Sequence, residues 1–437
     1  MKLAITDTGP ANSTTVVVPR APDRTRDAAA AEQSGRPPGR RAVGSRIAFW
    51  LLAFVLTAAM LGTTLPTPLY GIYQAQWHFS AAMVTVIFAV YAAAVLATLL
   101  LAGRSSDRAG RKPVLAVALA ISAVSTVAFI VAPNEGVLVA ARVLSGLSAG
   151  LITGTATATL TELIPASASR ARASLVATAA NMGGLGLGPL IAGLFAQFLP
   201  HPTTLVFEAY LAVLIAAGLC LRLIPETVLS RRRPTLRFAG LGIPEKGRGQ
   251  FIAIAVAAFA AFALLGLFSS LVPGFIGGEL HQGSHAVQGG VVFAMFAVGT
   301  ATQVALSRFA SRRVVLSGLG SFLLALALIL TALAQGSLPV FLAGTVVSGV
   351  AVGSIFLGSL ATANALAPAE RRGQAISAFF VACYAGLIIP VVGVGVLSAF
   401  VGTFTAVLVF ALLLAGLCLF SFARTATALA LPQSAGQ

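Results

Sequence analysis

Twelve apolar stretches, beginning near Ile47 and ending before the C-terminal tail, constrain this chain more than any other feature. A helix needs about 20 apolar residues to cross the hydrocarbon core of a bilayer, and only helices and closed barrels satisfy their backbone hydrogen bonds there. The sequence therefore predicts an all-α membrane protein with twelve transmembrane helices. The stretches centre near Phe54, Ala92, Ser122, Gly150, Gly186, Val213, Phe262, Met295, Leu324, Gly349, Ile388 and Leu412.

The composition and the placement of charge support this interpretation. Charged residues make up 9% of the chain, against about 25% in soluble domains. The net charge is +16, but every Lys and Arg except Arg142 falls in a terminal tail or in every second loop. Basic loops stay on the cytoplasmic side. We therefore expect a multi-pass protein of the inner (plasma) membrane with both termini in the cytoplasm, in contact with the lipid bilayer and not with nucleic acid.

One long connection, from Glu226 to Gln250, divides the predicted helices into two sets of six. We predict a disordered cytoplasmic tail over residues 1–45, because this segment is polar and poor in large apolar residues. An N-terminal six-helix bundle follows over 46–226, a cytoplasmic linker over 227–250, a C-terminal six-helix bundle over 251–424 and a second cytoplasmic tail over 425–437.

The two sets of helices repeat each other in sequence. The segment SDRAGRKPVL from Ser106 aligns with SRFASRRVVL from Ser307, at an offset of 201 residues. The segment SGLSAG from Ser145 aligns with SGVAVG from Ser348, at an offset of 203 residues. Parallel repeats of this kind are a known transporter architecture, in which the substrate site lies at mid-membrane between the halves.

The loop GRSSDRAGRK resembles the loop between helices two and three of the major facilitator superfamily, and it has every defining residue: Gly103, Asp107, Arg108, Gly110, Arg111 and Lys112. The resemblance covers about 46–424 and implies two pseudo-symmetric six-helix bundles with a cytoplasmic gate at this loop. We expect Asp107 to pair with Arg108 or Arg111 and to face a helix N-terminus of the other bundle. Glu162 is a second predicted partner, for Arg111 or Arg170. The alternative is a solvated basic loop that only sets topology.

Three further segments resemble motifs of the same superfamily and together favour an exporter. The segment RVLSG from Arg142 is similar to a motif of proton-coupled members, and LGTTLPTP from Leu61 to a pattern of twelve-helix drug/proton antiporters. The segment GLGLGPLIAG from Gly184 is similar to a signature of exporters and antiporters, with Ala192 in place of one glycine. Its glycines and proline are expected to let helix five bend and approach a neighbour closely. These residues are Gly184, Gly188, Pro189 and Gly193.

Two ionisable residues within the predicted helices are candidates for proton coupling. Arg142 is the only Lys or Arg inside a predicted span, and a charge there is costly enough to indicate function. We expect it either to hydrogen-bond to helix-one carbonyls freed around Pro66 and Pro68 or to hold water in the cavity, and the resemblance implies a part in proton transfer. The alternative is a side chain that extends outward to the interface. Glu208 in helix six is either a proton carrier or an outer-surface residue.

Aromatic and polar side chains in the predicted helices are candidates for the substrate cavity. A cavity with so little charge suits lipophilic or weakly polar compounds better than sugars or phosphates, which need many donors or basic clamps. The candidates are Tyr70, Tyr91, Asn181, Tyr210, Phe268, Gln303 and Tyr384.

These patterns lead us to expect a monomeric secondary transporter that exports small lipophilic or weakly polar compounds by alternating access, with protons as the coupling ion. An importer or facilitator of a small organic solute is the alternative within transport, and a non-transporting membrane sensor is the alternative of another class. The chain has no G-x-x-x-x-G-K-[ST] sequence, and its four histidines fall in predicted outer loops. We therefore expect neither an ATP-driven pump nor an enzyme, and no cofactor or metal site.

Overall fold

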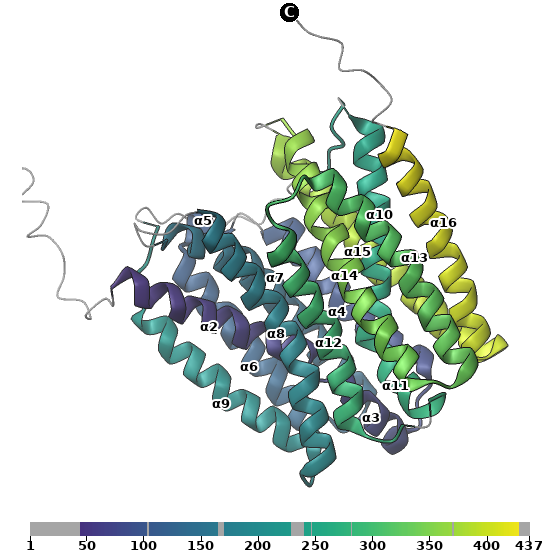
Figure 1. The fold of residues 1–437 in the computed structure, drawn as a ribbon. Coiled ribbons are helices and arrows are strands. Elements are labelled where there is room, and N and C mark those ends of the chain that lie inside the picture. The colour runs from purple at the N-terminus through teal and green to yellow at the C-terminus, as the bar shows by residue number, and fades with distance from the viewer. Residues whose placement is uncertain are drawn as a thin grey trace, which may run out of the picture. The chain divides into compact units, whose positions relative to one another are not determined.

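The structure, a computed structural model, describes residues 44–102, 105–164, 170–228, 240–245, 247–280, 282–368 and 371–427. These residues form helices joined by short connections (Figure 1). The loop residue Gly103, half of the predicted linker, and the predicted tails apart from residues 44–45 and 425–427 lie outside the described residues. The helices of the N-terminal half are α2 (Ser45–Thr64), η1 (Thr67–Leu69), α3 (Tyr70–Trp77), α4 (Ala81–Ala102), α5 (Ser105–Ala109), α6 (Arg111–Ile130), α7 (Glu135–Glu162), α8 (Arg170–Phe198) and α9 (Pro202–Leu223).

The C-terminal half follows the same plan. Its helices are α10 (Arg248–Ser270), α11 (Val272–Gly278), α12 (His285–Leu306), α13 (Ser311–Gln335), α14 (Leu338–Leu366), α15 (Arg372–Val401) and α16 (Thr403–Thr427). Within the described ranges, 12 helical segments are long and apolar enough to cross a membrane. Each contains one of the twelve predicted centres, so the predicted number and placement of the helices are confirmed.

The first span of each half is interrupted near its end, and proline explains both interruptions. Pro66 follows α2 and Pro273 lies in the first turn of α11, where proline removes an amide donor and crowds the preceding turn. The short helices after the two breaks, α3 and α11, lie side by side (Figure 1). Across the breaks, the Thr67 hydroxyl donates to the Ser269 carbonyl at 3.1 Å, which joins the two halves.

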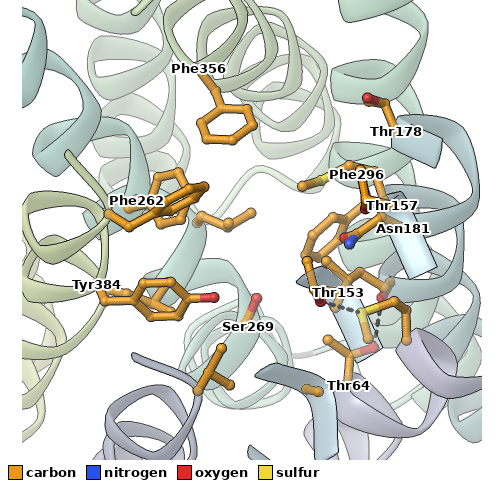
Figure 2. Close-up of a pocket in the computed structure, with 18 of the residues that line it drawn as sticks. Thr64, Thr153, Thr157, Thr178, Asn181, Phe262, Ser269, Phe296, Phe356 and Tyr384 are labelled. Atoms are coloured by element: carbon orange, nitrogen blue, oxygen red, sulfur yellow. Dashed lines mark hydrogen bonds between the residues drawn. The ribbon is translucent and has the colours of Figure 1, made fainter. Parts of the chain in front are cut away.

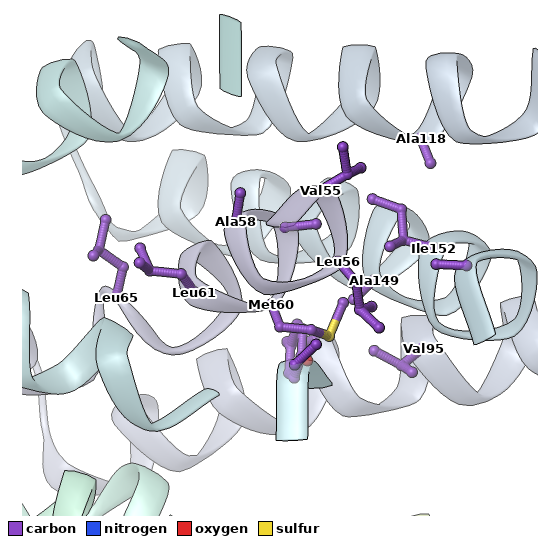
Figure 3. Close-up of a cluster of buried hydrophobic side chains, with 14 of the residues drawn as sticks. Val55, Leu56, Ala58, Met60, Leu61, Leu65, Val95, Ala118, Ala149 and Ile152 are labelled. Carbon is purple, nitrogen blue, oxygen red and sulfur yellow. The ribbon is translucent and has the colours of Figure 1, made fainter. Parts of the chain in front are cut away.

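Helix α2 is the centre of the apolar core of the N-terminal half. Leu56 and Val55 are fully buried and Met60 is almost so. Figure 3 shows these side chains on α2 beside those of its neighbours, including Val95 of α4 and Ile152 of α7. In a bilayer, close side-chain packing and interhelical hydrogen bonds provide the association that the hydrophobic effect provides in water. The tight centre around α2 therefore fixes the helices that carry the site described below.

Two tight crossings join the halves, and each depends on a glycine. A methyl group built on Gly193 of α8 would lie 2.5 Å from the His285 carbonyl oxygen of α12. One built on Gly289 of α12 would overlap the Pro189 carbonyl, and one on Gly395 of α15 would overlap the Thr85 hydroxyl of α4. The α8–α12 and α4–α15 crossings therefore occupy equivalent places in the two repeats.

The two ends of the helical bundle differ in charge. At one end, which we call the basic end, lie Arg111, Lys112, Arg312 and Arg371 with the starts of α6, α13 and α15. At the opposite end the described connections between spans contain no Lys or Arg. Both tight crossings lie in the part of α8 and α15 nearer to that opposite end.

Candidate functional site

A cavity of about 280 Å³ lies between the two halves. Four helices of each half line it: α2, α4, α7 and α8, and their repeat equivalents α10, α12, α14 and α15. The lining extends along α8 from Leu185 to Ser174, four residues after the start of that helix at the basic end. Its size is near the lower end of the range for small-molecule sites, which is about 300–1,000 Å³.

The lining is mainly apolar and aromatic, and among the described residues none of those that line the cavity is charged. Figure 2 shows Tyr384, Phe262 and Phe356 of the C-terminal half facing Thr153 and Asn181 of the N-terminal half across the open space. Hydroxyls and one amide supply the polar groups, on Thr64, Thr153, Thr157, Ser174, Thr178, Asn181, Ser269, Tyr91 and Tyr384. Such a surface recognises apolar rings and a few hydrogen-bonding groups.

Arg142 lies behind this lining, in α7, and its side chain is fully buried. Its Nε donates to the Tyr70 hydroxyl at 2.7 Å, and its Nη2 donates to the same oxygen. Its Nη1 donates to the Thr63 carbonyl in the last turn of α2, at 2.5 Å. The last carbonyls of a helix have no partner within it, so the end of α2 before Pro66 supplies an acceptor to the guanidinium.

Three aromatic rings complete the surroundings of Arg142. Its Cζ lies 5.4 Å from the Tyr70 ring centre, 5.3 Å from that of Tyr91 and 5.9 Å from that of Phe129. The negative faces of aromatic rings attract a cation at this range. Within the described ranges Arg142 makes no ion pair with a carboxylate, so a hydroxyl, a carbonyl and π faces stabilise its charge.

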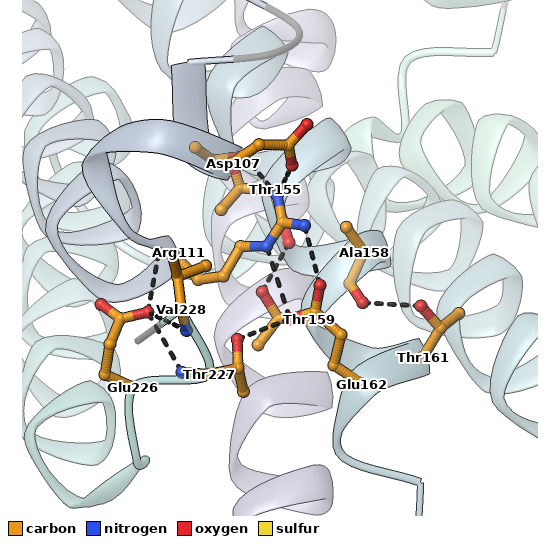
Figure 4. A network of polar contacts seen from close by, with 11 residues as sticks. Asp107, Arg111, Thr155, Ala158, Thr159, Thr161, Glu162, Glu226, Thr227 and Val228 are labelled. Carbon is orange, nitrogen blue, oxygen red and sulfur yellow. Dashed lines mark hydrogen bonds and ion pairs between the residues drawn. The ribbon is translucent and has the colours of Figure 1, made fainter. Parts of the chain in front are cut away.

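A second polar site occupies the basic end of the N-terminal half. Arg111 at the start of α6 pairs with Asp107 at 2.5 Å and with Glu162, at the end of α7, at 2.8 Å. In Figure 4 its guanidinium lies between the two carboxylates. The contact of Arg111 with Glu162 is bidentate, which is among the stronger charge-assisted arrangements. The Asp107 side chain is 54% exposed and that of Glu162 is 36% exposed, so solvent screens the Asp107 carboxylate more strongly.

The first residues after α9 fasten onto this site. The Glu226 carboxylate accepts the backbone amides of Arg111 at 2.9 Å and Lys112 at 3.2 Å, and therefore caps the start of α6. Thr227 donates its hydroxyl to Glu162 (Figure 4). In return, the Lys112 ammonium donates to the Arg222 and Ile224 carbonyls at the end of α9. The end of the sixth span, α9, is thus held against the start of the third span, α6, and the end of the fourth span, α7.

Comparison with known proteins agrees with this geometry. The sequence model of the Major Facilitator Superfamily matches residues 52–389. The chain belongs to the Major Facilitator Superfamily. Members of this superfamily are carriers, so the chain is a membrane transporter and not an enzyme. The two-bundle architecture with twelve transmembrane helices is that of the superfamily, as the sequence predicts.

Among curated relatives, the chain is 31% identical over 218 residues to the puromycin resistance protein pur8 of Streptomyces alboniger, which covers 48% of this chain and 42% of that protein. It is 25% identical over 165 residues to the quinolone resistance protein NorA of Staphylococcus aureus, which covers 38% of this chain and 42% of the relative. The chain thus matches less than half the length of either relative.

A solved structure of a bacterial homologue of the human lysosomal transporter Spinster, in an inward-facing and occupied conformation, superposes with a TM-score of 0.68. It is 16% identical in sequence and covers 87% of this chain and 97% of that one. At this identity the likeness concerns the superfamily fold.

The structure distributes the predicted cavity residues over several places. Tyr91, Asn181 and Tyr384 line the central cavity. Gln303 lines an adjacent small recess of about 20 Å³. The other three candidates do not line the central cavity. Tyr70 is buried against Arg142, Tyr210 is buried with its hydroxyl 3.1 Å from Ser122, and Phe268 is buried against Phe341. An aromatic ring packs equally well inside a bundle or along a cavity, so residue type alone did not separate the two.

The cavity residues that the sequence analysis missed are mostly small hydroxyls and phenylalanines. Thr153 and Thr157 follow each other by four residues on α7, and Ser174 and Thr178 lie on the same face of α8 as the predicted Asn181. Positions three and four residues apart share a helix face. The spacing of these small polar groups in apolar helices therefore indicates a helix face that lines a cavity. Aromatic and long polar residues alone do not indicate it.

The structure also places the predicted charged residues in different surroundings. Glu162 contacts Arg111, one of its two expected partners. Asp107 also pairs with Arg111, four residues further along in its own half. Glu208 is exposed on α9 and is not among the residues lining the cavity, which is the geometry of the outer-surface alternative. Among the other loop residues, Gly110 adopts a φ of 99°, a conformation that favours glycine, directly before α6.

The predicted close approach of the fifth span is present in the structure. Methyl groups built on Gly184 and Gly188 of α8 would collide with the Thr57 and Leu61 carbonyls of α2, and Gly193 meets α12. Pro189 lies inside α8, and its carbonyl meets Gly289. The glycines thus let α8 touch one neighbour in its own half and one in the other half.

Proposed function

We propose that the chain exports small lipophilic or weakly polar compounds by alternating access, driven by proton entry. The observation that carries the proposal is the uncharged cavity between the halves, to which four helices of each half contribute. A site built at the interface of two repeats is exposed to one side and then to the other when the halves rock. Its apolar and aromatic lining matches apolar compounds with few polar groups.

The two ends of the bundle support export as the direction of transport. We take the basic end as cytoplasmic, because basic loops are retained on that side. The cavity then extends towards the cytoplasm along α8, and the tight crossings at Gly193 and Gly395 lie towards the outside. A state of this kind takes up its substrate from the cytoplasm or from the inner leaflet, as an exporter must.

The two polar sites have complementary roles in this proposal. Arg142 is positioned to affect proton coupling, because it is a buried cation joined to the broken end of the first span and to a cavity residue, Tyr91. Arg111 with Asp107 and Glu162 forms the cytoplasmic gate, whose contacts rearrange when that end closes. The resistance proteins pur8 and NorA, which match parts of the chain, support export of drug-like compounds.

The experiment is a dye-accumulation assay in bacterial cells that lack their own major pumps and express this protein. Energised cells should retain less of a lipophilic dye than cells with empty vector, and the difference should disappear when a protonophore collapses the proton gradient. The panel includes an uncharged dye such as Nile red, a cationic dye such as ethidium and an anionic dye such as fluorescein. Equal retention of every dye with and without the protein would contradict export of lipophilic compounds.

One observation favours a second candidate, facilitated diffusion of a small organic solute. No carboxylate is present among the described residues that line the cavity, so proton binding there has no obvious acceptor. Export that persists after the proton gradient collapses, and that follows only the substrate gradient, would support the facilitator.

A further inference from the structure

We infer that the cavity discriminates by charge: it selects against cations and takes uncharged or anionic aromatic compounds. This inference rests on the proposed function and narrows its substrate class. It depends on three features of the structure. The described lining contains no acidic group, Arg142 is buried behind it, and the Tyr91 ring both lines the cavity and contacts Arg142.

The acidic residues of the described ranges all lie away from the cavity. Asp107, Glu162 and Glu226 belong to the network at the basic end, and Glu208 is exposed on α9. The other three, Glu135, Glu245 and Glu279, lie at the start of α7, before α10 and after α11. A lipophilic cation that leaves water for this cavity therefore loses its hydration without gaining a carboxylate, which is costly.

Arg142 lies beside the lining, and within the described ranges no ion pair neutralises its positive charge. Arg142 is fully buried, and its hydrogen bonds go to the neutral Tyr70 hydroxyl and Thr63 carbonyl. Charge interactions are much stronger in a poorly hydrated protein interior than in water. A second cation entering the cavity would be repelled by Arg142, and an anion would be attracted.

Tyr91 brings this charge to the cavity itself. Its ring lines the cavity and lies 5.3 Å from the Arg142 Cζ. A π system that is already engaged by one cation has less negative potential to offer to a second. A ligand beside Tyr91 therefore meets a ring suited to an electron-rich aromatic group and poorly suited to an ammonium group.

The polar groups of the lining fit the same ligands. The Ser269 and Tyr384 hydroxyls and the Asn181 amide each offer a hydrogen-bond donor, and Figure 2 shows these three side chains around the cavity. Donors of this kind serve the oxygen atoms of a neutral carbonyl compound, a phenolate or a carboxylate. Stacking against Phe262, Phe296 and Phe356 would bind an attached aromatic ring.

The test uses dyes of three charges and a substitution that adds one negative charge without changing shape. Wild-type protein should lower the retention of Nile red and fluorescein and leave that of ethidium near the empty-vector level. Asn181→Asp should increase ethidium export on the order of tenfold, the effect of one new charge-assisted contact. It should reduce fluorescein export by a similar factor. Asn181→Ala is the control for loss of the amide, and it should not gain ethidium export.

A second pair of variants guards against a folding defect at Asn181. Thr153→Asp places the charge on α7, where the Thr153 hydroxyl contacts only the Met60 sulfur at 3.7 Å among the described residues, and Thr153→Asn is its neutral match. Membrane levels of all variants are measured by fluorescence-detected gel filtration.

The possible outcomes separate the two proposals. Ethidium export by the wild type as strong as Nile red export would overturn the charge selection and leave the export function standing. Aspartate variants that reach the membrane and export Nile red but gain no ethidium export would also overturn it. If the wild type exports no dye of any charge, the proposed function itself fails, and the inference fails with it.

Discussion

The two halves carry equivalent positions with very different chemistry, and Arg142 and Thr345 show this most clearly. The offset of 203 residues that aligns SGLSAG with SGVAVG also places Arg142 opposite Thr345. Both side chains are fully buried. Arg142 reaches across to α2 and Tyr70, whereas the Thr345 hydroxyl donates at 2.9 Å to the Phe341 carbonyl of its own helix. At this position the N-terminal half connects its helices through a buried cation, and in the C-terminal half the equivalent side chain bonds only within its own helix.

The basic ends repeat this contrast. Arg111 and Arg312 are equivalent at an offset of 201 residues, and Arg308 replaces Asp107. Arg111 binds two carboxylates, while Arg312 donates to the Thr425 and Ala426 carbonyls at the end of α16, at 3.0 and 2.9 Å. In the N-terminal half Lys112 makes the corresponding contact with the end of α9. The helix-end contact is common to both halves, and the ionic network belongs to the N-terminal half.

The comparison teaches that one half of this fold is built without a buried charged side chain among its described residues. The charges of the N-terminal half are therefore extra features, and function is the reason to retain costly buried charge. This predicts that matched substitutions will have unequal effects in the two halves.

The largest difference in dye export between matched variants is expected for Arg142→Gln and Thr345→Ala. Removal of the guanidinium leaves the Tyr70 hydroxyl and the Thr63 carbonyl without their donor, and each buried polar group left unsatisfied costs about 1–3 kcal/mol. Dye export should fall by at least about thirtyfold, and Thr345→Ala should remain within about twofold of wild type. Both variants are compared at equal membrane level. Equal losses would show that the two positions are simply structural.

The next contrast is Arg111→Gln against Arg312→Gln. Loss of the bidentate contact with Glu162 and the pair with Asp107 should slow export about tenfold, because Arg111 is little exposed and its partners would be left without their cation. Loss of the Arg312 contacts with helix-end carbonyls should cost less, about threefold at most. Initial rates of dye efflux measure both. A stronger effect of Arg312→Gln would place the essential contact in the C-terminal half.

A smaller effect is expected for Asp107→Asn. This carboxylate is 54% exposed, and exposed pairs contribute about 0–1 kcal/mol. Export should fall about threefold, and Glu162→Gln, which removes the less exposed partner, should be the more damaging of the two. High salt should reduce the difference between Asp107→Asn and wild type, because it screens exposed charges. A complete loss of export in Asp107→Asn would mean that Asp107 makes a stronger contact in another state.

The smallest effect is expected for Glu208→Gln. Its side chain is exposed and away from the cavity, so export and its dependence on pH should stay within about 1.5-fold of wild type at every pH tested. A flattened pH profile would restore Glu208 as a proton carrier and would give the sixth span a place in the coupling.

The sequence predicted the helices well because the bilayer imposes a simple requirement on length and composition. The pairing of Glu162 with Arg111 was also accessible, since both residues fall at span ends on the same side. The cavity was harder. Tyr91 and Tyr384 face it while Tyr210 and Phe268 do not, and only the rotation of each helix about its axis decides this. In helices that are apolar on every side, the sequence carries little information on that rotation.

The contact between Thr67 and Ser269 has one further consequence. These residues are 202 positions apart, between the repeat offsets of 201 and 203, so each lies within one residue of the other's counterpart. In a symmetric dimer, a residue that touches its own copy lies beside the twofold axis, and the same geometry holds in a duplicated chain. The distance between two spin labels at these positions would therefore increase when the halves separate, and it would change little when they rotate about that axis.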